Sequence, residues 1–148
     1  MRPYPPFPVD DLFDMFPVPV ETIAKCYYGM EIHKRHLPDS VGAILHKFED
    51  RSYLYGNSSH SRERRRFTIA REFAHHRLHP IGEYMAGPGA SSASEKAADM
   101  IAADILMPRS EVMRLLSRNV SFDEMFEHFE GVQRAVRFRI DEVRKEAF

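Results

Sequence analysis

The stretch RRRFTIAREFAHHRLHP, from Arg64 to Pro80, decides how the fold is interpreted. Its apolar residues recur at intervals of three and four, which predicts a helix from about Arg62 to His79 that ends at Pro80. At about 100° per residue, one side of this helix gathers five polar residues within an arc of about 140°: Arg71, Glu72, His75, His76 and His79. Beside that arc lies the face that we expect to be buried, formed by Phe67, Ala70, Ala74 and Leu78.

The segment REFAH, Arg71 to His75, differs by one residue from an HExxH motif. In that motif two histidines four residues apart bind one Zn²⁺, and the glutamate acts as general base on the zinc-bound water. The glutamate (Glu72) and the second histidine (His75) are present here, but Arg71 stands at the position of the first ligand. A guanidinium keeps its proton in proteins, so Arg71 cannot coordinate zinc.

A second helix is predicted from about Ser94 to Leu106, and Pro108 follows its end. A catalytic zinc site uses three protein ligands and one open position, so a third ligand would come from outside the first helix. Glu95 at the start of the second helix is the nearest source. Asp99, one turn later, is placed to accept a hydrogen bond from a zinc-binding histidine, through the ring nitrogen that does not face the metal.

Together these two segments resemble the ImmA/IrrE family of metallopeptidases, small cytoplasmic proteins of bacteria and phages. Arg64–Pro80 is similar to the family's RFTxAHExGHxxLH block and departs from it at Arg71 and Ala74. The segment EKAADMIAADILMP, Glu95–Pro108, is similar to the ExxANxFAxxLLMP block, with Asp99 at the Asn position. Flanking segments extend the resemblance over about residues 18–145.

The resemblance implies roles for the site residues and a class of partner. By the family's pattern Glu72 would be the catalytic general base, His75 and Glu95 would be zinc ligands, and zinc would be the cofactor. Family members act on, or sit beside, a helix-turn-helix repressor of the Xre type. A repressor or an antitoxin-like protein is therefore the expected partner.

Arg71 provides an alternative to the metal. The carboxylates of Glu72, Glu95 and Asp99 would need another cation, or protons, if no dication neutralised them. Arg71 is placed to form a salt bridge with Glu95 or Glu72 and so to occupy the metal position. We therefore expect zinc to be absent or weakly bound and the peptidase to be inactive or impaired.

Three interpretations of the site stay open at this level. The first is the metal-free or impaired site. The second is a shifted metal site, because His75 and His79 are also four residues apart and could join Glu95, although His79 would serve equally well as a helix cap. The third is an active zinc endopeptidase whose active-site histidine has been replaced by arginine.

An enzyme and a non-catalytic regulator that sequesters its partner differ in their need for Glu72. The substitution Glu72→Gln would abolish the function of the first and hardly affect the second.

The predicted fold class is α+β, with a small three-stranded sheet packed on the two motif helices and closed by C-terminal helices. The expected strands are Met30–His36, Val41–Phe48 and Arg51–Tyr55, with Glu49-Asp50 as a hairpin turn and a helix before them from Pro19 to Tyr28. We divide the chain into an irregular proline-rich arm (1–17), a metallopeptidase-like core (18–108) and a C-terminal helical subdomain (109–148) of helix-turn-helix outline that packs on the core.

Composition excludes several other classes. Lys plus Arg (21) nearly balances Asp plus Glu (22), and acidic residues surround the C-terminal arginines, so direct DNA binding is not expected. The single cysteine, Cys26, excludes an internal disulfide and a multi-cysteine metal site. No apolar run approaches the roughly 20 residues of a membrane span, and a cytoplasmic location is expected.

Two further features carry weaker expectations. The run Arg62–Arg66 is expected to be a solvated helix face. Oligomeric state and the role of the proline-rich arm are not determined by composition.

Overall fold

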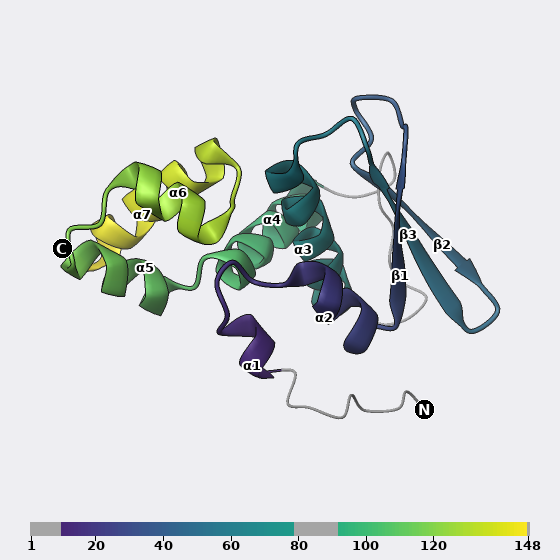
Figure 1. The fold of residues 1–148 in the computed structure, drawn as a ribbon, viewed down its shortest axis with the longest axis horizontal. Helices are drawn as coiled ribbons and strands as arrows, with labels where there is room; N and C mark the ends of the chain where they lie inside the picture. The colour runs from purple at the N-terminus through teal and green to yellow at the C-terminus, as the bar shows by residue number, and fades with distance from the viewer. Residues whose placement is uncertain (1–9, 79–91, 148) are drawn as a thin grey trace.

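The computed structural model describes residues 10–78 and 92–147, and it confirms the predicted α+β class (Figure 1). The strands are β1 (Met30–Arg35), β2 (Ala43–Phe48) and β3 (Arg51–Asn57). The helices are α1 (Asp10–Phe13), α2 (Val20–Cys26), α3 (Arg62–Leu78), α4 (Ser92–Leu106), α5 (Arg109–Ser117), α6 (Phe122–Phe129) and α7 (Gln133–Ala147). The sheet lies at one end of the molecule, α3 and α4 lie in the middle, and α5–α7 lie at the other end (Figure 1).

The three strands form one sheet in the order β1-β3-β2. β3 is antiparallel to β2, with Phe48 opposite Arg51, and the predicted two-residue turn Glu49-Asp50 joins them. Glu49 has a φ of 55°, the left-handed conformation that tight hairpin turns favour. β1 pairs with β3 in parallel, so the last strand along the chain is the central one.

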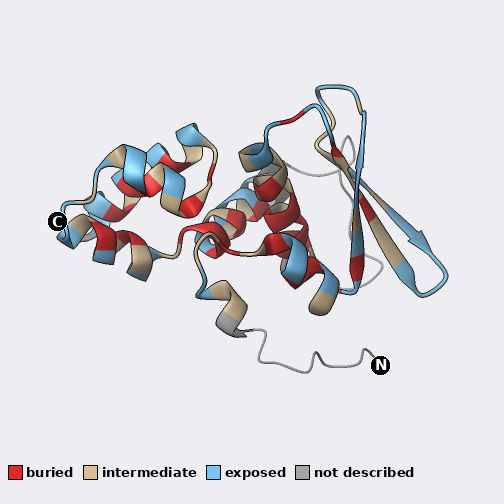
Figure 2. Ribbon diagram, in the orientation of Figure 1, coloured by how far each residue is buried: buried red, intermediate tan, exposed pale blue. Residues whose placement is uncertain are grey.

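Helix α3 packs between the sheet and α4, and its apolar face is the middle of the core. Leu54 at the centre of β3 and Phe73 on α3 are both fully buried, and the Phe73 ring stacks on Tyr28 at 4.6 Å between centroids. Buried residues are concentrated on α3 and α4, whereas β2 is mostly exposed (Figure 2). The sheet therefore covers α3 with one face only.

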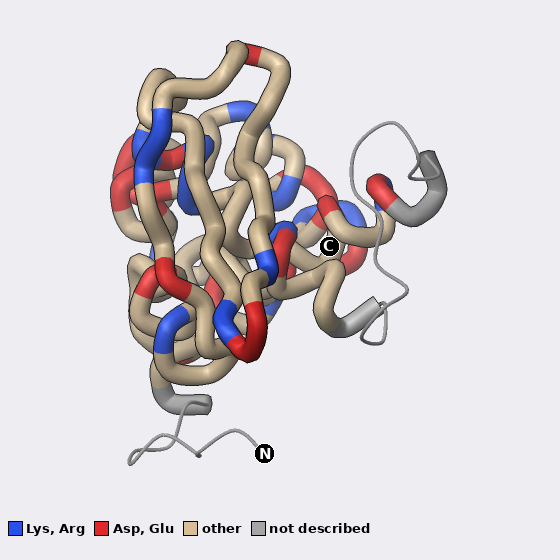
Figure 3. The backbone as a smooth tube through the Cα atoms, turned by 90° about the vertical axis from the view of Figure 1, so that its right-hand side faces the viewer, with Lys and Arg blue, Asp and Glu red and all other residues tan. Residues whose placement is uncertain are grey.

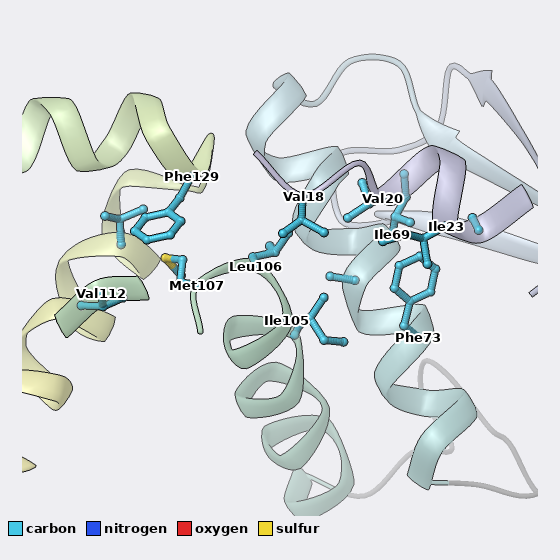
Figure 4. Close-up of a cluster of buried hydrophobic side chains, with 14 of the residues drawn as sticks. Val18, Val20, Ile23, Ile69, Phe73, Ile105, Leu106, Met107, Val112 and Phe129 are labelled. Atoms are coloured by element: carbon cyan, nitrogen blue, oxygen red, sulfur yellow. The ribbon is translucent and has the colours of Figure 1, made fainter. Parts of the chain in front are cut away.

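The C-terminal helices share this core. One cluster of buried side chains runs from Ile69 and Phe73 through Leu106 and Met107 to Phe129 (Figure 4). The turn between α6 and α7 is tight at Gly131, because a Cβ built there would lie 2.8 Å from a methyl group of Val136. A side chain at this position would therefore push α7 away from α6.

A buried arginine connects three distant parts of the chain. Arg66 on α3 donates through Nη1 to the carbonyl of Val18 at 2.9 Å, and through Nε and Nη2 to the carbonyls of Glu130 and Phe129 at 3.2 and 3.4 Å. Burial lowers the pKa of this guanidinium, although Glu130 opposes the effect. The expectation of a solvated face is thus wrong for Arg66, whose side chain satisfies carbonyls at the C-terminal end of α6.

Arg139 on α7 makes a second buried connection. Its Nε donates to the carbonyl of Met107 at 2.9 Å, just after α4, and its two Nη atoms lie 2.5 Å from Asp104 and Glu142 carboxylate oxygens. Arg66 thus fastens the end of α6 to α3, and Arg139 fastens the middle of α7 to the end of α4.

The N-terminal segment lies on the C-terminal helices. The Phe16 ring is 5.3 Å from the His128 ring and 5.7 Å from the Phe129 ring, centroid to centroid. Residues 10–13 form the short helix α1, so the expectation of a wholly irregular arm is wrong there. Residues 1–9 lie outside the described residues.

Charged residues of both signs are scattered along the described backbone on the side that carries the sheet (Figure 3). None of the described helices combines the length and apolar character that a membrane span requires.

Replacing Arg66 by Met should lower the free energy of unfolding by about 2–4 kcal/mol, because three carbonyl oxygens would lose their donor inside the protein. Arg66→Lys should recover only part of this loss, since an ammonium cannot reproduce the planar fork of donors. Urea denaturation followed by circular dichroism measures both. Arg64→Met, on the exposed side of the same helix, is the control and should change stability by less than about 0.5 kcal/mol. If Arg66→Met unfolded at the same urea concentration as this control, the structural role assigned to Arg66 would be wrong.

Candidate functional site

The predicted site residues come from two helices packed along each other. Arg71, Glu72 and His75 lie on α3, and Glu95 and Asp99 lie near the start of α4. Ala74 on α3 and Ala98 on α4 are fully buried between the bulkier residues. Small residues let the helices approach closely, which brings the polar side chains of one helix against those of the other.

Arg71 is at the centre of this cluster. Its Nη2 forms an ion pair with Oε2 of Glu95, one of the two carboxylates that the sequence suggested as its partner. Its Nε lies 2.8 Å from Oδ1 of Asp99. The guanidinium thus bridges two acidic residues that are one turn apart on α4. About a third of each of the Arg71 and Glu95 side chains is exposed, so the pair lies at the edge of the protein rather than deep inside it.

Glu95 also faces His75. The Oε1 atom of Glu95 lies 3.7 Å from Nε2 of His75, which is too long for a hydrogen bond but close enough for a favourable charge contact when the ring is protonated. His75 itself is almost fully buried. Glu95 therefore stands between Arg71 and His75, with one carboxylate oxygen toward each.

The other predicted residues are placed as follows. Glu72, the predicted general base, is buried on α3 beside the fully buried Phe73. Asp99, predicted to support a histidine, has the Arg71 guanidinium as its ion-pair partner. His76 is half-buried, with its ring 5.2 Å from that of Tyr28. His79 lies outside the described residues.

The donor set of the described residues does not fit a zinc ion. Within residues 10–78 and 92–147 no group of three His, Cys, Asp or Glu side chains is arranged to hold a metal. The position of the first ligand carries a permanent cation, and that cation lies on the carboxylate of Glu95, the predicted third ligand. We therefore derive no zinc chemistry for these residues.

Sequence reasoning missed the structural role of Arg66, although a signal was present. Arg66 precedes the buried residues Ile69, Ala70 and Phe73 by three, four and seven positions, so it lies on their face of α3. The neighbouring arginines concealed this, because a run of charges normally indicates a solvated surface. The spacing from the apolar stripe is therefore the better guide to burial at this position.

Comparison with known proteins identifies the fold. The family model Peptidase_M78, described as an IrrE N-terminal-like domain, matches residues 26–141. A comparison with curated protein sequences finds no significant match. Among solved structures, a Mycobacterium tuberculosis transcriptional regulator superposes with a TM-score of 0.62 and 18% identity over 83% of this chain.

The match covers 40% of that regulator, so this chain spans less than half of its length. At this level of identity the likeness concerns the fold alone. The family model, in contrast, covers most of the chain and includes both motif helices. The resemblance to the ImmA/IrrE family is thereby confirmed, and the chain belongs to the Peptidase_M78 family of IrrE N-terminal-like domains.

Proposed function

We propose that this protein is a non-catalytic, or strongly impaired, member of its family that binds a partner transcriptional regulator, and that Arg71 occupies the metal position. The observation that carries the proposal is the ion pair between Arg71 and Glu95. The same carboxylate is the predicted third zinc ligand. The guanidinium occupies one of its two oxygens and places a positive charge beside the other.

Charge supports this proposal. Arg71 supplies one positive charge to the two carboxylates of Glu95 and Asp99, in place of the dication that zinc would bring. A zinc ion entering here would have to displace the guanidinium from Glu95 and would then lie beside a second cation. Glu72 and His75 are buried on one side of the site, so water would screen that repulsion only from the exposed side.

The class of partner rests on the family and the fold. Membership of the IrrE-like family and the structural likeness to a transcriptional regulator both support a role in transcription. We propose a helix-turn-helix repressor or an antitoxin-like protein as the partner. Such a partner would be held rather than cut, because no described group of donors is suited to activate water through a metal.

A second candidate function, a zinc endopeptidase with a shifted ligand set, is favoured by one contact. His75 lies 3.7 Å from Glu95, so these two side chains could act together if a third ligand joined them. In this case His79 would be that ligand.

Metal content separates the two candidates. After growth with added zinc and removal of any affinity tag, the protein with Arg71 should hold far less than one zinc ion per chain by elemental mass spectrometry. Arg71→His should hold about one, because it restores three ligands and removes the cation. The double variant Arg71→His/His75→Ala is the matched control and should lose the metal again. About one tightly held zinc in the natural sequence would refute the proposal, and single alanine variants of His75, His79 and Glu95 would then identify the ligands.

The ion pair should also be visible as an energetic coupling. In a double-mutant cycle of Arg71→Gln and Glu95→Gln, the two changes should be less damaging together than the sum of the single effects, by about 0.5–1.5 kcal/mol. The value is modest because about a third of each side chain is exposed. Urea denaturation of the four proteins gives the coupling, and the exposed pair Arg109–Glu146 provides a comparison cycle with a smaller value. A coupling of zero would mean that the guanidinium does not compensate Glu95.

Glu72 distinguishes binding from cleavage in the cell. In cells that lack the gene, a copy carrying Glu72→Gln should restore the same transcript profile as the natural sequence, because a holding function does not need a general base. RNA sequencing measures this, with empty vector as the reference. A Glu72→Gln profile that matches the empty vector, from protein present at normal abundance, would instead indicate catalysis.

A further inference from the structure

A large groove lies apart from the ion-paired cluster, among α3, α4 and α7. Its volume is about 990 Å³. Its lining includes two of the most exposed large apolar side chains among the described residues, Phe138 on α7 (69% exposed) and Met100 on α4 (60% exposed). Phe67, Ala103, Val132 and Ala135 extend the apolar surface between them. A groove that combines exposed apolar side chains with a charged rim is a candidate binding surface.

Each acidic residue of the groove already has an arginine partner within the chain, although Asp104 and Glu142 share one arginine. Asp104 and Glu142 both lie 2.5 Å from Arg139. Glu146 lies 3.1 Å from Arg109, and Asp99 is held by Arg71. A cationic ligand would therefore meet carboxylates that have their own partners.

Three cations that line the groove differ from these acidic residues in their pairing. Arg64, Lys96 and Arg134 line it, all are exposed, and none forms a salt bridge with an acidic side chain of the described residues. Within the described residues, the Arg64 side chain donates a long 3.5 Å hydrogen bond to the carbonyl of Asp39. The groove thus has a positive rim, although the whole chain carries a net charge of −1.

The backbone around the groove limits the form of the occupant. Its lining residues lie on α3, α4 and α7, at Arg109 in the first turn of α5, or at Pro108 and Val132 in the short links beside these helices. Backbone groups within helices are hydrogen-bonded to each other, so an extended peptide would find no strand edge to pair with. A helix satisfies its own backbone and presents side chains alone, which suits this surface.

We propose that the groove docks one amphipathic helix of the partner protein, with its apolar face on Phe138 and Met100 and acidic residues beside that face. This inference rests on the proposed function and deepens it by assigning the surface and chemistry of the partner. Lys96 to Asp104 on α4 spans about 12 Å, so the contact needs two to three turns of the docked helix. The helix would lie next to the ion-paired cluster, because Asp99 belongs to both.

The test uses the full chain and a phage-displayed library of random 16-residue peptides. Peptides retained by the natural sequence but lost on the Phe138→Ser variant are sequenced. They should show apolar residues at intervals of three and four, and a net negative charge. One such peptide is then synthesised with a fluorescent label, and its affinity is measured by anisotropy.

Phe138→Ser should weaken binding of that peptide at least tenfold, and Arg134→Glu about threefold or more at low salt, with a smaller effect at high salt. Phe48→Ser removes an aromatic side chain of similar exposure on β2, away from the groove, and should leave affinity within twofold. Failure to enrich any Phe138-dependent peptide would overturn the proposal. Enriched peptides that are neutral or basic, or an equal loss with Phe48→Ser, would also overturn it.

This result is independent of the metal question. Peptide binding is measured without added zinc, and metal content is measured without peptide. If the protein binds the peptides and also holds zinc, the proposal of a metal-free site is refuted and the proposal about the groove is retained. If the protein holds no zinc and enriches no such peptide, only the proposal about the groove is refuted.

Discussion

The three hydrogen bonds of Arg66 are the constraint on which the arrangement of the molecule depends. A guanidinium in the interior needs acceptors for its donors, and here they come from Val18 near one end of the chain and from Phe129 and Glu130 near the other. The N-terminal segment, α3 and the end of α6 are therefore fixed around one side chain. Everything that α3 presents elsewhere, including the ion-paired cluster and one side of the groove, depends on that fixed position.

Helix α3 uses two arginines in contrasting ways. Arg66 is buried and bound to neutral carbonyls, so it acts as a structural connector. Arg71, five residues later, is partly exposed and bound to carboxylates, so it compensates charge. A carbonyl cage suits a permanent cation that never has to leave. A carboxylate pair at the protein edge is the kind of environment that also suits a metal, so in the proposed function the identity of residue 71 decides which cation the pair holds.

The sequence predicts the parts of this structure that depend on local spacing. Helices α3 and α4 and the β2–β3 hairpin follow from periodicity and turn residues, and the contact between Arg71 and Glu95 follows from charge at two motif positions. The order β1-β3-β2 could not be predicted, because strand patterns do not say which strands are neighbours. Phe138 lies outside the apolar stripe of α7, so its place in a groove becomes visible only when α3 and α4 are beside it.

The central place of β3 in the sheet has a consequence for how the chain acquires its structure. β1 and β2 lie at opposite edges and share no hydrogen bonds, so neither has a partner until Arg51–Asn57 has been synthesised. The hairpin of β2 and β3 closes a loop of two residues, so this pairing is local in the sequence. The parallel pairing of β1 with β3 closes a loop of about 20 residues. During translation, β1 must therefore wait as an unpaired strand while its partner emerges from the ribosome. Met30 at its start is the residue of this strand that the finished structure buries, so its apolar side chain stays uncovered in that interval.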